Sequence, residues 1–100
     1  MSSENLKKLK LVFFDVETTG LSPFHNDRVC EIGMLACRGF DIMKSYRTLV
    51  NPQRSISPGA SAINGITDEM VRDAPVFSDV LPELQHGCSP VVQHKWVALL

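Results

Sequence analysis

The sequence predicts a small α/β fold in which a three-stranded antiparallel meander is followed by short helices. Three apolar, β-prone runs separated by short turn-rich connections occupy the first half of the 100 residues, and such spacing is typical of a meander. The second half carries helix-capping residues and an apolar stripe at helical spacing. Because three strands and two short helices bury little surface, we expect a thin core.

The first predicted strand begins at Leu11 and ends in two carboxylates, Asp15 and Glu17. Apolar side chains occupy both of its faces for most of its length, so we expect a central strand that is covered on both sides. Side chains two positions apart leave the same face, which places Asp15 and Glu17 together, about 7 Å apart along the backbone. Two such anions repel each other and favour a shared proton or a hard cation between them, for which Mg²⁺ or Mn²⁺ is the natural candidate.

Two further strands are predicted, from Arg28 to Cys37 and from about Asp41 to Val50. Glu31 lies within the apolar run of the second strand. We therefore expect Glu31 to form an ion pair with Arg28 or with a neighbouring strand, and not to bind a metal.

Helix signals begin at Ser57-Pro58, which provide an N-cap and a proline at the first helical position, and this short helical turn can end at Asn64-Gly65. Thr67 is the next N-cap candidate, and two acidic residues follow it, where the helix dipole favours anions. A second short helix is therefore expected from residue 68 to about residue 72 or 73.

A further helix is predicted over residues 76–84, where apolar residues recur at helical spacing. Pro82 lies inside this pattern and lacks a backbone N–H, so it can kink or split the helix. Beyond Gly87 the pattern leaves three options open: a strand, the start of a helix, or an unstructured end.

The composition is that of a soluble globular protein, with 44% hydrophobic and 21% charged residues and a formal charge of −1. This charge argues against binding long nucleic acid through many phosphate contacts, but not against holding a few nucleotides through metal ions.

The three cysteines, Cys30, Cys37 and Cys88, are odd in number and show no Cys-x-x-Cys spacing, so neither a disulfide framework nor a zinc site is expected. Cys30 and Cys37 are interpreted as packing residues. A reducing, cytoplasmic setting fits best, and the polar, lysine-rich residues 1–10 resemble neither a signal peptide nor a membrane span.

Several motifs in the right order resemble one enzyme family. Residues 15–21, Asp-Val-Glu-Thr-Thr-Gly-Leu, resemble the first signature of the DEDD 3′-to-5′ exonucleases, a family that includes the proofreading epsilon subunit of bacterial DNA polymerase III. Residues 28–33 resemble the second-strand pattern of that family, and residues 63–71 with 74–77 resemble the segment before its second signature. The resemblance covers roughly residues 11–84.

This resemblance implies a ribonuclease H-like fold, here incomplete, and hydrolysis of a terminal phosphodiester by two Mg²⁺ or Mn²⁺ ions about 4 Å apart. One ion would activate the attacking water and the other would stabilise the leaving 3′ oxygen. Asp15 would bridge both ions and Glu17 would help to hold one of them. The residues implied to border the terminal nucleotide are Thr18, Thr19, Gly20, Leu21, Asn64 and Ile66. Asn64 stands where many family members have histidine.

The resemblance also implies partners. The substrate would be the single-stranded 3′ end of DNA, with RNA as a second option. A DNA polymerase subunit would be the protein partner, in the proofreading step of DNA replication. No membrane partner is expected.

The later signatures of the family are not recognisable. The second requires an aspartate five residues after a histidine, but the residue five positions after His94 is Leu99. His25 and His86 are interpreted as surface histidines. We therefore divide the chain into a polar segment (1–10), the N-terminal part of an exonuclease domain (11–86) and a divergent tail (87–100), which leaves a fragment, a frameshifted or truncated reading frame, and a degenerate copy as alternatives.

Two other functions compete with this interpretation. A non-catalytic fragment or interaction module of exonuclease ancestry is the main alternative, because an incomplete sheet leaves unpaired strand edges. Haloacid-dehalogenase phosphatases carry a superficially similar Asp-x-Asp-Gly-Thr loop. Their loop leads into a helical cap, whereas a strand hairpin is expected after Pro23 in this chain.

Overall fold

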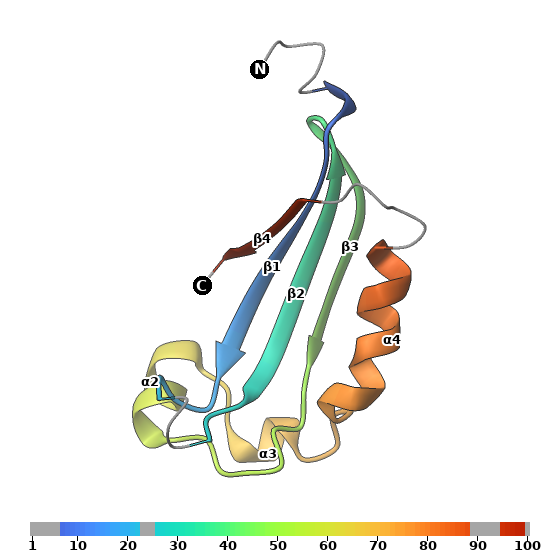
Figure 1. Ribbon diagram of the computed structural model, residues 1–100. Helices are drawn as coiled ribbons and strands as arrows, with labels where there is room; N and C mark the ends of the chain where they lie inside the picture. The colour runs from blue at the N-terminus through green and yellow to red at the C-terminus, as the bar shows by residue number, and fades with distance from the viewer. Residues whose placement is uncertain (1–6, 23–25, 89–94, 100) are drawn as a thin grey trace.

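The computed structural model describes residues 7–22, 26–88 and 95–99, which form one four-stranded sheet with helices after the third strand (Figure 1). Its strand order is β3-β2-β1-β4. The strands are β1 Lys10–Thr18, β2 Val29–Arg38, β3 Asp41–Leu49 and β4 Lys95–Leu99.

The predicted antiparallel meander is confirmed by the pairing of β1 with β2 and of β2 with β3. Asp15 on β1 lies opposite Gly33 on β2, which in turn lies opposite Arg47 on β3. The predicted central position of β1 is also confirmed, because β4 pairs parallel to its other edge. Of the options left open for the tail, the structure contains a strand at Lys95–Leu99.

Between β3 and β4 the described residues form helices α2 Pro58–Asn64, α3 Asp68–Val71 and α4 Phe77–Cys88. The predicted caps of the first two are confirmed. Ser57 Oγ accepts a hydrogen bond from the Ala60 N–H at 3.1 Å, and Thr67 caps α3 in the same way. Gly65 ends α2 with a φ of 73°, a left-handed conformation that glycine adopts without steric cost.

Helix α4 covers one face of the sheet. It is a single helix that continues through Pro82, and its Val80 and Leu84 are buried in the main core cluster. The sheet residues of that cluster are Val12, Ile32, Met34 and Ala36. Figure 1 shows α4 running alongside the sheet, whereas α2 and α3 lie at the end of the sheet where β1 finishes.

The opposite face of the sheet is hollowed. A cavity of about 820 Å³ lies there, and Phe13, Asp15, Gly33, Leu35 and Arg47 are among its lining residues. We expected β1 to be covered on both sides. Among the described residues, α4 covers one face of β1, whereas the other face borders the cavity. The carboxylate of Asp15 belongs to the hollowed face.

A second core cluster lies beneath the loops at the end of the sheet where β1 finishes. It consists of Cys30, Ile56, Ile66 and Val71, all of them buried. Burial, followed by the charges of Glu17 and Glu31, raises the pKa of the Cys30 thiol from 9.0 to about 11. The packing role expected for Cys30 is confirmed, and its thiol stays protonated at neutral pH.

No helix in the described ranges combines the length and the apolar character needed to cross a membrane.

Candidate functional site

Three carboxylates and one guanidinium group lie on the hollowed face of the sheet. Asp15 and Glu17 leave β1 on the same side because side chains alternate along a strand. Glu31 lies opposite Glu17 on β2. The Arg47 guanidinium on β3 lies 3.1 Å from Glu31 Oε1 and 3.6 Å from Asp15 Oδ2. The expectation that Glu31 pairs with a neighbouring strand is thus confirmed.

The backbone changes direction where the carboxylate strand ends. The register of β1 with β2 shifts between Glu17 and Thr18, and the Thr18 hydroxyl donates a hydrogen bond to the Gly20 carbonyl at 2.6 Å. Thr19 is anchored on both sides: its N–H donates to the Arg28 carbonyl at 2.8 Å, and its carbonyl accepts the Ser57 N–H at 2.9 Å. The turn that follows Glu17 is therefore tied to the residues that immediately precede β2 and α2.

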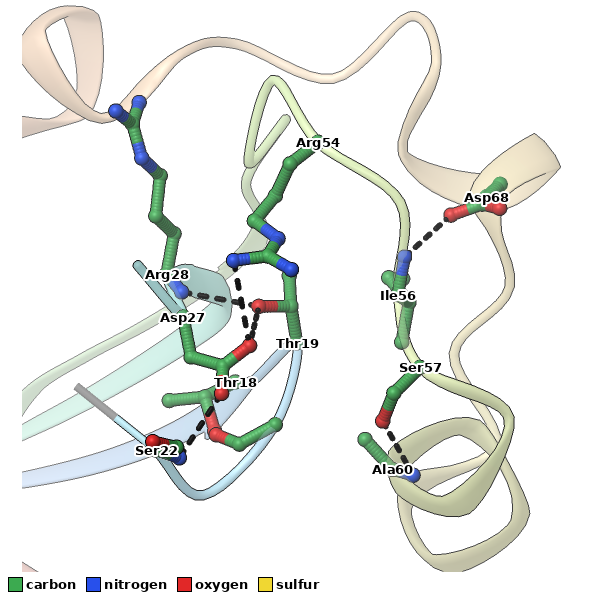
Figure 2. A network of polar contacts seen from close by, with 11 residues as sticks. Thr18, Thr19, Ser22, Asp27, Arg28, Arg54, Ile56, Ser57, Ala60 and Asp68 are labelled. Atoms are coloured by element: carbon green, nitrogen blue, oxygen red, sulfur yellow. Dashed lines mark hydrogen bonds and ion pairs between the residues drawn. The ribbon is translucent and has the colours of Figure 1, made fainter. Parts of the chain in front are cut away.

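A mostly buried carboxylate, that of Asp27, holds this turn together (Figure 2). Asp27 Oδ1 accepts the Thr19 hydroxyl at 2.9 Å, and Oδ2 accepts the Ser22 N–H at 2.9 Å. Arg54 Nη1 lies 3.6 Å from Oδ1, and the side chain of Asp27 is only 11% exposed. Thr19 Oγ in turn accepts the Arg28 N–H at 3.0 Å. Because charged hydrogen bonds are stronger than neutral ones, this network fixes the turn.

The same carboxylate packs against Gly20 and leaves no room for a side chain there. A Cβ atom added to Gly20 would lie 2.5 Å from Asp27 Oδ2, which is far inside van der Waals contact. The close approach of turn and carboxylate therefore depends on the missing side chain.

A second cavity, of about 340 Å³, opens between this turn and α2. It is lined by Glu17, Thr18, Gly20, Leu21, Ser57, Gly59, Ala60, Ile63 and Asn64. Asn64 joins the two walls, because its Nδ2 donates to the Thr18 carbonyl at 3.3 Å while its Oδ1 accepts the Ile66 N–H at 2.9 Å. The cavity thus brings together one of the two carboxylates and four of the six residues expected to border a nucleotide.

The other two of these six residues do not line the cavity. Thr19 is fully buried, and its hydroxyl points to Asp27. Ile66 is buried in the second core cluster, and its backbone N–H contacts Asn64. Their positions make them supports for the cavity wall.

Three residues that shape this site were not expected from the sequence: Asp27, Arg54 and Arg47. Asp27 and Arg54 lie in irregular loops, where no periodicity assigns a partner to a charged residue. A signal did exist for Arg47, because strand alternation places it on the same face as its cross-strand neighbours. Using that signal requires the register of β2 with β3, which depends on a bulge between Ala36 and Cys37.

The donor chemistry of Asp15 and Glu17 fits a hard divalent cation. Mg²⁺ is commonly held by one or two carboxylates together with substrate phosphates, and both side chains offer carboxylate oxygens on one face. Within the described ranges no group of three or more His, Cys, Asp or Glu side chains is placed to hold a metal. His25 and His94 lie outside the described residues.

Comparisons of sequence identify relatives of this chain. Residues 12–99 match the family model RNase_T, described as exonuclease. PolC-type DNA polymerase III of Caldanaerobacter subterraneus is 43% identical over 74 residues, which is 74% of this chain and 5% of that protein. PolC-type DNA polymerase III of Bacillus subtilis is 36% identical over 92 residues, which is 90% of this chain and 6% of that protein. The chain thus spans a small part of these relatives.

Solved structures of exonucleases share the fold. Exonuclease X in complex with 5′-overhanging duplex DNA superposes with a TM-score of 0.66 at 38% identity, covering 74% of this chain and 42% of that chain. The nuclease domain of 3′hExo, a DEDDh family member bound to rAMP, gives a TM-score of 0.75 at 18% identity, covering 89% of this chain and 50% of that domain. The expected ribonuclease H-like fold, present in part, is confirmed. The chain belongs to the exonuclease family whose model matches residues 12–99.

Proposed function

We propose that this chain acts as a 3′-to-5′ exonuclease domain that removes the terminal nucleotide of DNA with the help of Mg²⁺ or Mn²⁺. The observation that carries the proposal is the cavity of about 340 Å³ that adjoins the end of β1, because Glu17 is one of its lining residues. A nucleotide in this cavity would present its phosphate to the carboxylates of β1. The scissile bond and the metal-binding side chains would then meet at one place.

Asp15 and Glu17 would hold the cations on the hollowed face. When bound, two such ions lower the pKa of the attacking water and neutralise negative charge on the leaving 3′ oxygen. The protein itself would position the nucleotide. Asp27 fixes the turn after Glu17, so the backbone of that turn would form a rigid wall against the nucleotide. Rigid placement of this kind contributes to rate because the reacting groups need not be ordered during the reaction.

Two apolar side chains at the cavity suit a nucleic acid base. Leu21 is 95% exposed and Ile63 is 84% exposed, and they belong to opposite walls. Large apolar side chains that are exposed together are costly in water unless a ligand covers them. The flat face of a base is a ligand of that kind.

Single-stranded DNA 3′ ends and a replicative DNA polymerase are the substrate and partner that we propose. Proteins similar to this chain support this choice. Exonuclease X was solved with duplex DNA that carries a 5′ overhang, which supports DNA as the substrate. The similar sequences belong to PolC-type DNA polymerase III, which supports a polymerase as the partner. Replication proofreading in the cytoplasm is the role that this combination favours.

A nuclease assay tests the proposal. A 5′-labelled single-stranded DNA oligonucleotide incubated with the chain and Mn²⁺ should shorten one nucleotide at a time from its 3′ end. The Asp15→Asn variant should lose this activity because a neutral amide is a weak ligand for a hard cation. Asp73→Asn, which removes one exposed carboxylate from the turn after α3, is the matched control and should retain activity.

A purified chain that is folded and yet leaves the oligonucleotide intact contradicts catalysis by this chain. That outcome would favour the second candidate, a non-catalytic module of exonuclease ancestry. Activity that survives in Asp15→Asn would point to a contaminating nuclease and would equally contradict the assignment.

A further inference from the structure

We propose that Arg47 is a built-in counter-cation that competes with divalent metal for Asp15 and thereby sets the metal affinity of the site. This inference rests on the proposed function, because it takes Asp15 and Glu17 as the metal-binding carboxylates. It assigns to Arg47 a positioning and regulatory role, and not a catalytic one.

The cross-strand geometry brings Arg47 to Asp15 across an intervening strand. Asp15, Gly33 and Arg47 are register partners on β1, β2 and β3. A Cβ atom added to Gly33 would lie 2.6 Å from Arg47 Nη2, so the guanidinium lies directly over the glycine backbone. The missing side chain on β2 therefore opens a path along which Arg47 reaches β1.

The guanidinium contacts two acidic side chains at once. Its Nη2 lies 3.6 Å from Asp15 Oδ2, and its Nη1 donates to Glu31 Oε1 at 3.1 Å. The planar guanidinium fork can hold two carboxylates in fixed directions, which a lysine ammonium cannot do in the same way. Glu31 thus anchors Arg47 in the position from which it contacts Asp15.

The ion pair is exposed enough to be reversible. The side chains of Arg47 and Asp15 are 56% and 42% exposed, and exposed pairs of this kind contribute little to stability. A divalent cation bound to Asp15 would be repelled by the nearby guanidinium and would have to share or displace it. Removing the positive charge should therefore strengthen metal binding.

A matched pair of variants isolates this effect. Arg47→Met removes the charge and keeps most of the side-chain length. Lys44→Met removes one positive charge from the same strand, but Lys44 lies on the opposite face because it is three residues from Arg47. Lys44→Met therefore reports any general effect of net charge or of strand stability.

Mn²⁺ binding measured by isothermal titration calorimetry at low ionic strength provides the test, since it does not require catalysis. Coulomb repulsion of a divalent ion at this range, reduced by water, predicts that Arg47→Met lowers the Kd for Mn²⁺ by roughly threefold to tenfold. Lys44→Met should change the Kd by less than about twofold, because its charge is more distant and more screened. Arg47→Lys should lie between wild type and Arg47→Met.

The outcomes separate the inference from the function on which it rests. Mn²⁺ binding that is lost in Asp15→Asn but unchanged or weakened in Arg47→Met overturns the role of Arg47 and leaves the metal site intact. No Mn²⁺ binding to the wild type or to any variant contradicts the metal site itself, and the inference falls with it.

A measurement on the wild type covers the case in which Arg47→Met does not fold. The ¹⁵Nε resonance of Arg47 should shift during a Mg²⁺ titration, and the shift should saturate together with the backbone shifts around Asp15. A resonance that stays in place while the backbone amides near Asp15 move would overturn the proposal.

Discussion

Replacing Thr19 with valine should destabilise the fold by about 2–4 kcal/mol, although the two side chains have nearly the same shape. Thr19 is fully buried. Its hydroxyl donates to Asp27 Oδ1 at 2.9 Å and accepts the Arg28 N–H at 3.0 Å. Valine removes both hydrogen bonds and leaves a backbone N–H and a mostly buried carboxylate short of a partner.

The magnitude follows from these two losses. A hydrogen bond to a charged group contributes about 1.5–3 kcal/mol, and an unsatisfied buried donor costs about 1–3 kcal/mol. Partial access of water to Asp27 and Arg28 lowers the sum to about 2–4 kcal/mol. Small domains are stable by only about 5–15 kcal/mol, so this is a large fraction of the total.

Urea unfolding followed by circular dichroism measures the effect. Thr48→Val is the matched control, because the Thr48 hydroxyl donates only to the neighbouring Leu49 carbonyl and valine favours strands. The control should stay within about 0.5 kcal/mol of wild type. If Thr19→Val were as stable as the control, the turn would not depend on the Asp27 network, and the reasoning would be refuted.

Two further predictions concern the same end of the sheet. Gly20→Ala should lower the free energy of unfolding by about 1–3 kcal/mol, because the added Cβ would push against Asp27. Gly59 lines the same cavity, and a Cβ added there would meet open space. The control Gly59→Ala should therefore show no such loss in parallel urea titrations. The raised pKa of Cys30, about 11 instead of 9.0, means that folding favours the protonated thiol. The contribution of the Cys30 thiol to the free energy of unfolding is therefore fully present below pH 9 and is lost as the pH rises towards 11. Between these pH values, the free energy of unfolding should fall less steeply for Cys30→Ala than for wild type. Equal slopes for the two proteins would contradict the raised pKa.

Local sequence signals predicted the elements of the fold well. The apolar run that ends in Asp15 and Glu17 gave β1, and the caps at Ser57 and Thr67 gave the starts of α2 and α3. Such signals act within a few residues, so they can be read without tertiary structure.

The sequence left open whether Pro82 kinks or splits the last helix. The helix continues through Pro82 because the proline lies on its exposed side. Pro82 and Ser78, whose carbonyl loses its helical partner, are both exposed. Water can satisfy that carbonyl, while Val80 and Leu84 keep the helix packed against the sheet. Only the three-dimensional arrangement decides which side of the helix carries the proline.

Some of the residues that form the site could be predicted from the sequence. Strand alternation alone places the side chains of Asp15 and Glu17 on the same face of β1. The contact between Asn64 and Thr18 spans 46 residues and was not expected. Only the family resemblance placed both residues near one nucleotide. The roles of Asp27 and Arg47 depend on a loop conformation and on a bulged strand register, which no local pattern encodes.

Nucleotide binding followed by NMR tests most directly the claim that the carboxylates of β1 and the turn after them form one site. A deoxynucleoside 5′-monophosphate titrated in the presence of Mg²⁺ should shift the backbone amides of residues 17–21 and of Asn64, which line or adjoin the cavity of about 340 Å³. In Asp15→Asn the same titration should leave these amides unchanged, because the cation that links phosphate to protein would no longer be held. Shifts that cluster elsewhere on the chain, or that persist in Asp15→Asn, would contradict the claim.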